Sequence, residues 1–327
     1  MRQEGDGIVL VVGASGLIGR STARFLRYNN HLVRGVSRGF GEYRTEQAMR
    51  EDLSGIDLRF GDIADSAFAK EAVEGVGRVV FAAGVSGVGA SIADPAASRR
   101  GMLEPWSALV EHGNPGTRIV MMCSQLVYGP PAGRPFTESD PLAPVSPYAE
   151  NLVLMEREGR RQAEIRRLEV ISLRLGNVFG EILWLDQPRA HGMVALMVRD
   201  LVRRHEIRLF GGGSQTVNLL HVEDLARAIA LVVESESMST FSVFNVCGEQ
   251  VSVRLVAESL RAGVGEGTLA SVPWPLGLER TVASDIELDD SRFRAAFGWK
   301  PTRAVHAEIK RVAQAYVSSS MGSSQGS

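Results

Sequence analysis

The sequence predicts an α/β fold built on a doubly wound parallel sheet, with a smaller lobe in the second half of the chain. Three observations support this. Short, continuous apolar runs alternate with helical stretches through the first half;. A glycine-rich turn joins the first apolar run to the first helix. Beyond about residue 175 the strands become shorter and the regular alternation ends. Strand–helix–strand units of this kind place successive strands parallel in one sheet.

Residues 8–12 form a short, continuous apolar run, which suits a strand covered by helices on both faces;. Further strands are predicted at 32–36, 57–60, 77–82, 117–122 and 170–173. Helices are predicted from the glycine turn to about residue 28, and at 65–74, 95–112 and 148–166. The proline-rich segment 129–147 is long for a loop in a compact domain, which favours a functional role;.

The second half is expected to form mainly a substrate-binding lobe. Its strands are predicted at 207–210 and 241–246, and its helices at about 191–204, 222–234 and 252–262. The chain is therefore divided into a cofactor-binding domain at 1–175, a lobe at 176–315 with some return to the first domain, and a disordered Ser/Gly-rich tail at 316–327;.

The bulk composition argues for an ordinary cytoplasmic globular protein. Of the 327 residues, 44% are hydrophobic and 23% charged, and the formal net charge is -2. This balance gives no electrostatic footprint for nucleic acid or an anionic membrane. No apolar run reaches the roughly 18 residues that span a bilayer, and the polar N-terminus is not a signal peptide;. Cys123 and Cys247 stand in apolar segments and are interpreted as buried free thiols;.

The glycine turn predicts a dinucleotide site. Gly13, Gly16 and Gly19 stand at G-x-x-G-x-x-G spacing between a strand and a helix. One glycine permits the tight turn, one lets the backbone approach a pyrophosphate, and one lets helix and strand pack closely. The helix N-terminus then offers free N–H groups to the diphosphate. The pattern indicates a Rossmann-type fold, with cofactor contacts from Gly13, Ser15, Gly16, Leu17, Ile18 and Gly19;.

The end of the second strand predicts which cofactor binds. An acidic residue there would accept hydrogen bonds from the ribose hydroxyls and favour NAD. This chain has Ser37 and Arg38 instead. Arg38 can pair with a 2′-phosphate and Ser37 can donate to it, so NADP(H) is expected, with NAD as the second choice.

Seven further short motifs follow the glycine turn along the chain. They are Gly61-Asp62-Ile63, Ala82-Ala83, Ser124-Gln125-Leu126-Val127-Tyr128-Gly129, Ser146-Pro147-Tyr148, the glycine-rich run at 211–216, His221-Val222-Glu223-Asp224 and Phe297-Gly298-Trp299-Lys300-Pro301. With these motifs the chain resembles the extended short-chain dehydrogenases, the group of nucleotide-sugar epimerases, dehydratases and ketoreductases, from about residue 8 to 312.

The resemblance implies roles for individual residues. Ser124 and Tyr148 would be the catalytic pair, because a ketone that accepts hydride develops negative charge on its oxygen, which two hydroxyl donors stabilise. Tyr148 would also touch the cofactor. The remaining implied contacts are Asp62 and Ile63 with the adenine, Ala82, Ala83 and Gly84 along the cofactor, and Ser86, Gln125, Asn177 and Arg280 with a sugar or nucleotide-sugar substrate. The helices at 95–112 and 148–166 resemble those that form homodimers in this family.

Three positions depart from the family pattern. The family has Tyr-x-x-x-Lys, whereas Leu152 stands four residues after Tyr148, on the same helical face;. A nearby positive charge typically lowers a pKa by about 1–3, so its loss leaves the phenol harder to ionise. Met102 replaces an asparagine that helps a proton path, and Val217 replaces an arginine that contacts the diphosphate.

Three functions remain open from the sequence. The first is an NADP(H)-dependent reductase of a nucleotide-linked keto-sugar, in which Tyr148 and Ser124 donate to the carbonyl. The second is an NAD(P)-dependent nucleotide-sugar epimerase, and the third is a catalytically degenerate cofactor-binding protein. No metal is expected, since His221 has no second ligand at metal spacing and is interpreted as capping the helix at 222–234;.

Overall fold

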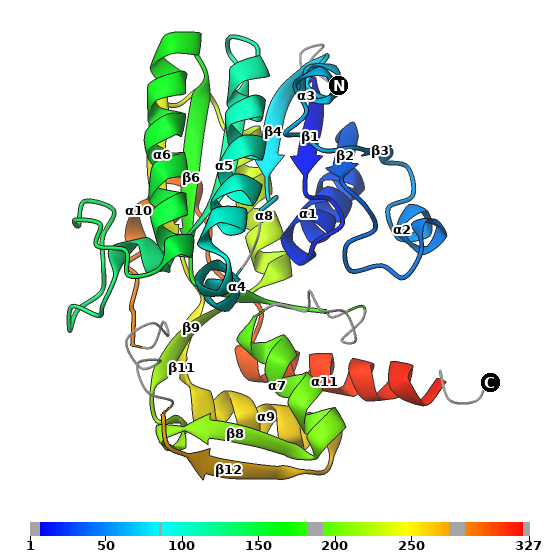
Figure 1. The fold of residues 1–327 in the computed structure, drawn as a ribbon, viewed down its shortest axis with the longest axis vertical. Helices are drawn as coiled ribbons and strands as arrows, with labels where there is room; N and C mark the ends of the chain where they lie inside the picture. The colour runs from blue at the N-terminus through cyan, green and yellow to red at the C-terminus, as the bar shows by residue number, and fades with distance from the viewer. Residues whose placement is uncertain (1–6, 85–86, 182, 184–191, 275–284, 323–327) are drawn as a thin grey trace.

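The main sheet occupies the upper half of the molecule in Figure 1. The computed structural model describes residues 7–84, 87–181, 183, 192–274 and 285–322. Seven parallel strands follow the order β10-β6-β5-β4-β1-β2-β3. They are β1 (Ile8–Val12), β2 (Val33–Ser37), β3 (Asp57–Phe60), β4 (Val76–Phe81), β5 (Arg118–Ser124), β6 (Glu169–Leu175) and β10 (Phe241–Val246). The strand order reverses beside β1, where the glycine turn lies, and this confirms the predicted doubly wound α/β class.

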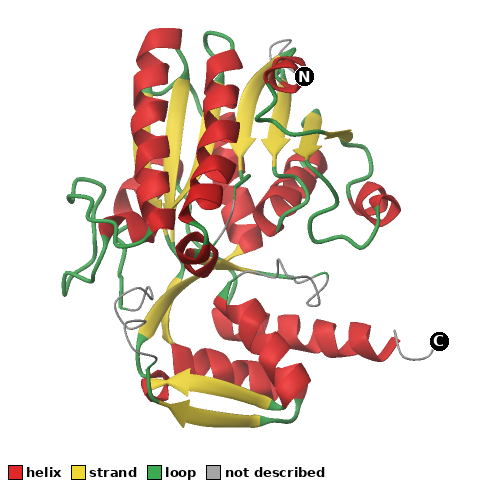
Figure 2. Cartoon of the chain, viewed as in Figure 1, coloured by secondary structure: helices red, strands yellow, loops and turns green. Residues whose placement is uncertain are grey.

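Helices cover both faces of this sheet (Figure 2). On one face lie α3 (Ser66–Ala72), α4 (Val88–Ala93), α5 (Pro95–His112) and α6 (Pro147–Arg166). On the other lie α1 (Leu17–Tyr28) and α8 (Val222–Glu234), with α2 (Glu46–Asp52) and α10 (Ser291–Phe297) toward the edges. Trp106 is fully buried under the first layer and Leu10 within the sheet. Helices on both faces of the sheet therefore account for the continuous apolar sequence of β1;.

The second half of the chain supplies a smaller lobe below the sheet. Its strands are β7 (Asn177–Phe179), β9 (Thr216–His221) and β11 (Glu249–Ser252) in one sheet, and β8 (Glu206–Phe210) and β12 (Thr268–Val272) in another. Its helices are α7 (Met193–Arg204), α9 (Val253–Val264) and α11 (Val305–Gly322). Val256, Leu260 and Ile309 form the centre of its core. None of the described helices is long and apolar enough to cross a membrane.

Two expectations are corrected. The strand at 241–246, expected within the lobe, is β10 and pairs with β6 at the edge of the main sheet. Its alternate residues Phe244 and Val246 are buried there, a setting that position in the chain does not reveal. Residues 316–322, expected in a disordered tail, continue α11, because Tyr316 packs against the lobe core.

Candidate functional site

The glycine turn has the geometry of a dinucleotide cradle. Gly13 has a φ of +89°, and a Cβ there would stand 2.8 Å from the carbonyl of Ala82. A Cβ on Gly19 would stand 2.0 Å from the carbonyl oxygen of Gly13, so neither position accepts a side chain. Gly16 caps α1 with no side-chain hydrogen bond. The Leu17 amide of this first turn bonds to the Glu42 carboxylate. The other N–H groups of the turn suit a diphosphate.

The end of β2 carries an exposed cation, Arg38, beside the buried Ser37. Ser37 is buried, and its hydroxyl donates to the carbonyl of Gly39 at 2.5 Å and lies 2.6 Å from the Ser15 hydroxyl. The Arg38 side chain is 60% exposed and stands 3.8 Å from the Asp62 carboxylate. A 2′-phosphate would compete for Arg38 against this one distant carboxylate, whereas Ser37 must first give up its bond to Gly39.

The other implied cofactor residues surround the same edge. Ile63 is buried in the core, so any contact with an adenine would come from its backbone. Gly84 has a φ of +145° and faces the Met102 side chain, whose Cγ would lie 3.6 Å from a Cβ at Gly84. Leu17 and Ile18 form the first turn of α1, where both are half-buried. The structure thus gathers the implied residues from β1, β2, β3 and β4 at the carboxyl edge of the sheet.

The implied catalytic residues are Ser124, at the end of β5, and Tyr148, at the start of α6. Ser124 closes β5, where its hydroxyl accepts from the Leu126 amide at 3.3 Å. Tyr148 lies in the first turn of α6, which Ser146 caps, and its amide donates to the Ser91 hydroxyl at 3.1 Å. Burial of the hydroxyl, with a smaller effect from Cys123, raises the pKa of Tyr148 to about 12. This phenol keeps its proton across the physiological range and can act as a donor.

The two departures on this face are core residues. Leu152 and Met102 are both 3% exposed and belong to one apolar cluster that Tyr148 borders. Near them, the Asn151 amide approaches the Met102 sulfur at 3.8 Å and the Ser98 hydroxyl at 3.4 Å. Where the resemblance implies a lysine and an asparagine, the structure therefore holds a packed apolar wall. Val217, the third departure, is buried in the core of the lobe.

Two of the implied substrate residues carry unpaired polar atoms. Gln125 is 2% exposed, and its Oε1 has no hydrogen-bond partner among the described residues. Asn177 begins β7, and its Nδ2 is likewise buried without a partner in that part of the chain. A buried polar atom left unpaired is costly, so both atoms suit a ligand that pairs with them. Ser86 and Arg280, the other two implied contacts, lie outside the described residues.

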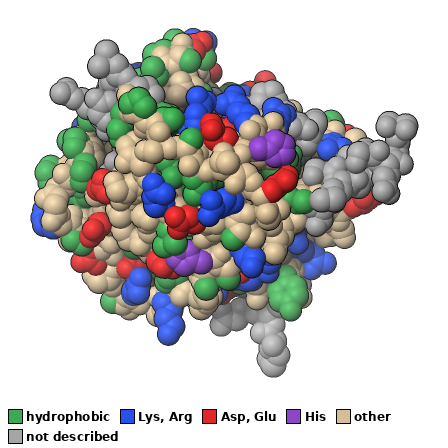
Figure 3. Space-filling view, turned by 90° about the horizontal axis from the view of Figure 1, so that it is seen from below, with side chains coloured by type: hydrophobic (Ala, Val, Ile, Leu, Met, Phe, Trp, Pro, Cys, Tyr) green, Lys and Arg blue, Asp and Glu red, His purple; other side chains and the backbone are tan. Residues whose placement is uncertain are grey.

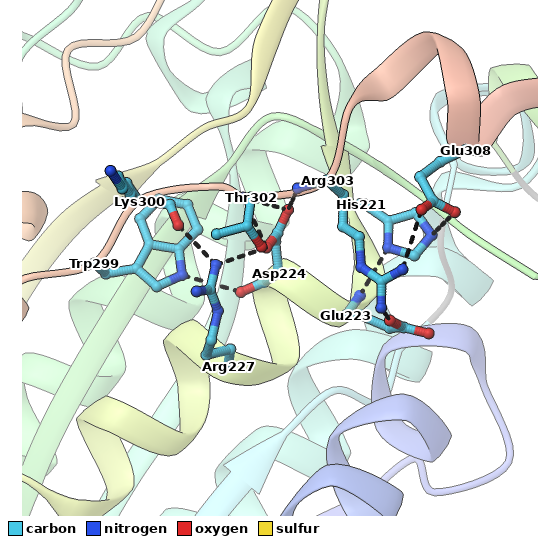
Figure 4. Close-up of polar contacts among 9 residues, drawn as sticks. All are labelled: His221, Glu223, Asp224, Arg227, Trp299, Lys300, Thr302, Arg303 and Glu308. Atoms are coloured by element: carbon cyan, nitrogen blue, oxygen red, sulfur yellow. Dashed lines mark hydrogen bonds and ion pairs between the residues drawn. The ribbon is translucent and has the colours of Figure 1, made fainter.

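The lobe is fastened to the cofactor domain at the start of α8 (Figure 4). His221 caps α8, with Nδ1 accepting from the Glu223 amide at 3.3 Å, as the sequence predicted. Asp224 accepts from the backbone amides of Thr302 and Arg303 at 3.1 and 2.9 Å, and its carbonyl accepts from the Trp299 indole at 3.1 Å. Two motifs noted separately in the sequence thus bind each other.

Sequence reasoning missed Arg20. This arginine directly follows Gly19, is 2% exposed, and pairs with Glu42 at 3.3 Å and Glu181 at 3.5 Å. It ties the loop after β2 to the chain beyond β7. Arginine is usually a surface residue, so the sequence carries no signal for this burial.

A groove of about 970 Å³ lies along α1, α8 and α11, next to these contacts. Its charged lining comprises Arg20, Arg24, Arg27, Arg227, Arg303, Arg311, Asp52, Glu181, Glu223, Asp224 and Glu308. On the face of the molecule seen in Figure 3, basic and acidic side chains are similarly mixed.

Comparison with known proteins agrees with this geometry. Residues 9–247 match the family described as the NAD dependent epimerase/dehydratase family. A UDP-glucose 4-epimerase of Mycolicibacterium smegmatis is 28% identical over 93% of this chain and 97% of its own. A dTDP-4-dehydro-6-deoxy-D-allose reductase of Streptomyces bikiniensis is 29% identical over 79% of this chain and 81% of its own.

Other curated relatives match over little more than half of their length. The chain spans 58% of a putative UDP-glucose 4-epimerase of Methanocaldococcus jannaschii and 54% of a dTDP-4-dehydro-6-deoxyglucose reductase of Escherichia coli. Among solved structures, the UDP-glucose 4-epimerase of Thermotoga maritima superposes with a TM-score of 0.81 at 21% identity, over 96% of this chain and 99% of that one. At this identity the likeness concerns the fold.

Proposed function

The chain belongs to the NAD dependent epimerase/dehydratase family, and we propose that it is an NADP(H)-dependent reductase of a nucleotide-linked keto-sugar. One observation supports reduction above all. Burial raises the pKa of Tyr148 to about 12, and Leu152 stands where the family's lysine would lower it. Reduction of a ketone requires a proton donor, which the neutral phenol provides. Oxidation of an alcohol requires a base, for which this tyrosine is poorly suited.

The residues of this chain divide the work as follows. The nicotinamide, when bound, supplies a hydride to the carbonyl carbon. Ser124 and Tyr148 donate hydrogen bonds to the carbonyl oxygen, and Tyr148 transfers its proton to that oxygen, which gives an alcohol and leaves a tyrosine phenolate. The phenolate must take up one proton from solvent before the next turnover. Gln125 and Asn177 orient the sugar or its nucleotide through the two buried atoms that have no partner among the described residues.

The exposed guanidinium of Arg38 supports a preference for NADP(H). Its side chain is 60% exposed at the end of β2, the position at which an acidic residue would favour NAD;. A phosphate carries up to two negative charges and accepts a bidentate bond from a guanidinium, so it would displace the Asp62 carboxylate 3.8 Å away;.

An epimerase is the second candidate. The relative from Mycolicibacterium smegmatis, matched over 97% of its length, is a UDP-glucose 4-epimerase. An epimerase of this kind oxidises and re-reduces one carbon with a retained cofactor, and so needs the tyrosine as a base in one of its two steps. Cofactor exchange therefore separates the candidates: a reductase releases its oxidised cofactor on each turnover, whereas an epimerase retains it.

The first experiment is a titration of the purified protein with NADPH and NADH, followed by nicotinamide fluorescence. Arg38→Gln should weaken NADPH binding by about ten- to a hundredfold, equivalent to about 1.4–2.8 kcal/mol, and leave NADH binding unchanged. Arg50→Gln is the matched control, because Arg50 is a half-exposed arginine of α2 paired with Glu46.

NADPH oxidation with UDP- and dTDP-linked 4-keto-sugars then tests the reaction. Turnover with NADPH supports the reductase. A tightly retained cofactor with interconversion of sugar epimers would instead establish the epimerase. Binding of neither cofactor would refute both enzymes and leave a degenerate scaffold.

A further inference from the structure

A buried charged pair links the helix of Tyr148 to the segments beside the candidate substrate site. We propose that Glu156 and Arg174 are positioning residues that, through the Tyr128 hydroxyl, hold the proline-rich segment 129–147 and the segment 286–290 in place for a nucleotide sugar. The inference rests on the proposed function for its substrate and on the contacts below for its geometry.

The register of the main sheet explains why Arg174 is central. On β6, Arg174 lies directly beside Cys123 of β5 on one side and Asn245 of β10 on the other. Ser124 is the next residue along β5, and its neighbour on β6 is Leu175. Arg174 is therefore one residue before the level of the implied catalytic serine, on the strand next to the edge strand β10.

Arg174 is tied to α6 by a two-pronged ion pair. Its Nε and Nη2 donate to the two carboxylate oxygens of Glu156 at 3.0 and 2.7 Å. The Ser172 hydroxyl donates to the same carboxylate at 2.7 Å. Arg174 and Glu156 are each 5% exposed. Because Glu156 lies two helical turns after Tyr148, this pair fixes the rotation of the helix that presents the phenol.

The third nitrogen of Arg174 reaches across to the substrate side. Its Nη1 donates to the Tyr128 hydroxyl at 3.0 Å, and that hydroxyl donates to Asn245 Oδ1 at 2.7 Å. The Tyr128 ring stacks on Phe136, with centroids 4.7 Å apart and planes 8° from parallel. One phenol thus joins the charged pair to β10 and to the proline-rich segment.

Asn245 continues the link to two segments at once. Its Nδ2 donates to the carbonyls of Phe136 at 2.9 Å and Asp289 at 3.1 Å, and its backbone amide donates to Glu138 at 2.9 Å. Phe136 and the chain at 287–289 also exchange backbone hydrogen bonds of 2.8 and 2.9 Å. Asn245 therefore holds the proline-rich segment and segment 286–290 together, and Asn245 is itself bonded to Arg174 through the Tyr128 hydroxyl.

This arrangement predicts a division of effects. The linked residues Glu156, Arg174, Tyr128 and Asn245 contact the elements that carry Tyr148, Gln125 and the proline-rich segment. The contacts described above do not include the glycine turn or the end of β2. Breaking the link at Tyr128, which leaves the Glu156–Arg174 pair and the helix of Tyr148 in place, should weaken nucleotide binding and leave cofactor binding intact. A simple loss of packing would instead weaken both.

The test compares Tyr128→Phe with Tyr43→Phe in the full chain. Each removes one hydroxyl from a buried tyrosine; the control hydroxyl donates to Asp52 at 2.5 Å, on the other side of the sheet. Hydrogen–deuterium exchange should accelerate by about tenfold or more in segments 129–147 and 286–290 together in Tyr128→Phe, because the variant loses the two hydrogen bonds of the Tyr128 hydroxyl, to Arg174 and to Asn245;. Tyr43→Phe should leave both segments unchanged.

Ligand binding supplies the second measurement. The dissociation constant of UDP or dTDP should rise by about tenfold in Tyr128→Phe, while that of NADPH stays the same. Arg174→Lys keeps the positive charge but loses the two-pronged geometry, and it should weaken nucleotide binding. Glu156→Asp keeps the carboxylate on a shorter side chain and should also bind the nucleotide more weakly than the wild type does.

Faster exchange in only one segment, or none, would overturn the proposal, as would a loss of NADPH affinity equal to that of the nucleotide. If the wild type binds neither UDP nor dTDP, the proposed substrate class is wrong, and hydrogen exchange alone still decides the coupling of the two segments.

Discussion

Leu152 lies one helical turn after Tyr148 on α6, and both side chains pack against the same apolar cluster. Residues four apart in a helix share a face, so the residue best placed to influence the phenol is an apolar one. With Leu152 3% exposed, that place is filled by core packing. The phenol is thereby kept neutral, which favours proton donation over proton removal.

The pH dependence of catalysis should reveal this bias. Because the pKa of Tyr148 is raised to about 12, the proton donor remains intact up to about pH 10, and the reduction rate should be flat from pH 7 to about pH 9;. The reverse oxidation needs the phenolate and should rise about tenfold for each pH unit over that range. A reduction rate that falls with an apparent pKa near 7 would contradict this assignment.

Restoring the family's lysine should not restore activity. Leu152→Lys places an amine in a packed apolar wall, where an unpaired charge is costly, so we expect a lower melting temperature and lower turnover. Leu152→Met preserves volume and should cost less than about 1.5 kcal/mol. Thermal melts and NADPH oxidation measure both effects. A large gain in turnover for the lysine variant would instead show that the site is a decayed form of the usual one.

Removing the Asp224 carboxylate should loosen the lobe from the cofactor domain. Asp224 is 2% exposed and accepts hydrogen bonds from Thr302, Arg303 and Arg227. Hydrogen bonds to charged groups are worth about 1.5–3 kcal/mol each, so Asp224→Ala should lower the free energy of unfolding by about 3 kcal/mol or more. Glu223→Ala removes a half-exposed carboxylate next to it and should cost at most about 1 kcal/mol;. Equal effects in urea unfolding would refute the role of Asp224.

Acid should destabilise the protein through His221. Burial lowers the pKa of His221 below its usual 6.5, although Glu308 and Glu223 oppose that shift. The unfolded chain then binds a proton more readily than the folded one, so stability falls as the pH drops below about 6.5. His221→Asn retains a capping side chain without a titratable ring, and its melting temperature should depend less on pH between about 5 and 7. An identical pH profile for both proteins would exclude His221 as the cause.

Dimerisation through α5 and α6 should depend on salt. The exposed residues of these helices are largely charged: Arg99, Arg100, Glu104 and Glu111 on α5, and Glu150, Arg157, Arg160, Arg161 and Glu164 on α6. A homodimer formed by this face would rely on ion pairs. The Debye length falls from about 10 Å at 0.1 M salt to about 3 Å at 1 M, so the attraction between charges farther apart than this is screened. Sedimentation should show dimers that dissociate as salt rises. A dimer that withstands 1 M salt would place the interface elsewhere.

Local pattern in the sequence was enough for most of the cofactor domain. Segments rich in apolar residues located β1 to β6 to within two residues. Only β1 is apolar throughout, as burial on both faces favours;. The glycine spacing located the turn, because Gly13 and Gly19 lie too close to backbone for any side chain. Capping of α8 by His221 was also evident, since helix capping is a local interaction;.

Contacts between distant segments were decided by the tertiary structure alone. Arg20 and Arg174 are buried although arginine is usually exposed, and each is satisfied by partners on other elements, such as Glu181 for Arg20 and Glu156 and Tyr128 for Arg174;. Strand β10 joined the main sheet because an open edge beside β6 could pair with it. The sequence determined which residues must be apolar, turned or capped; only the packed chain determined which buried charges could meet, because that depends on long-range register.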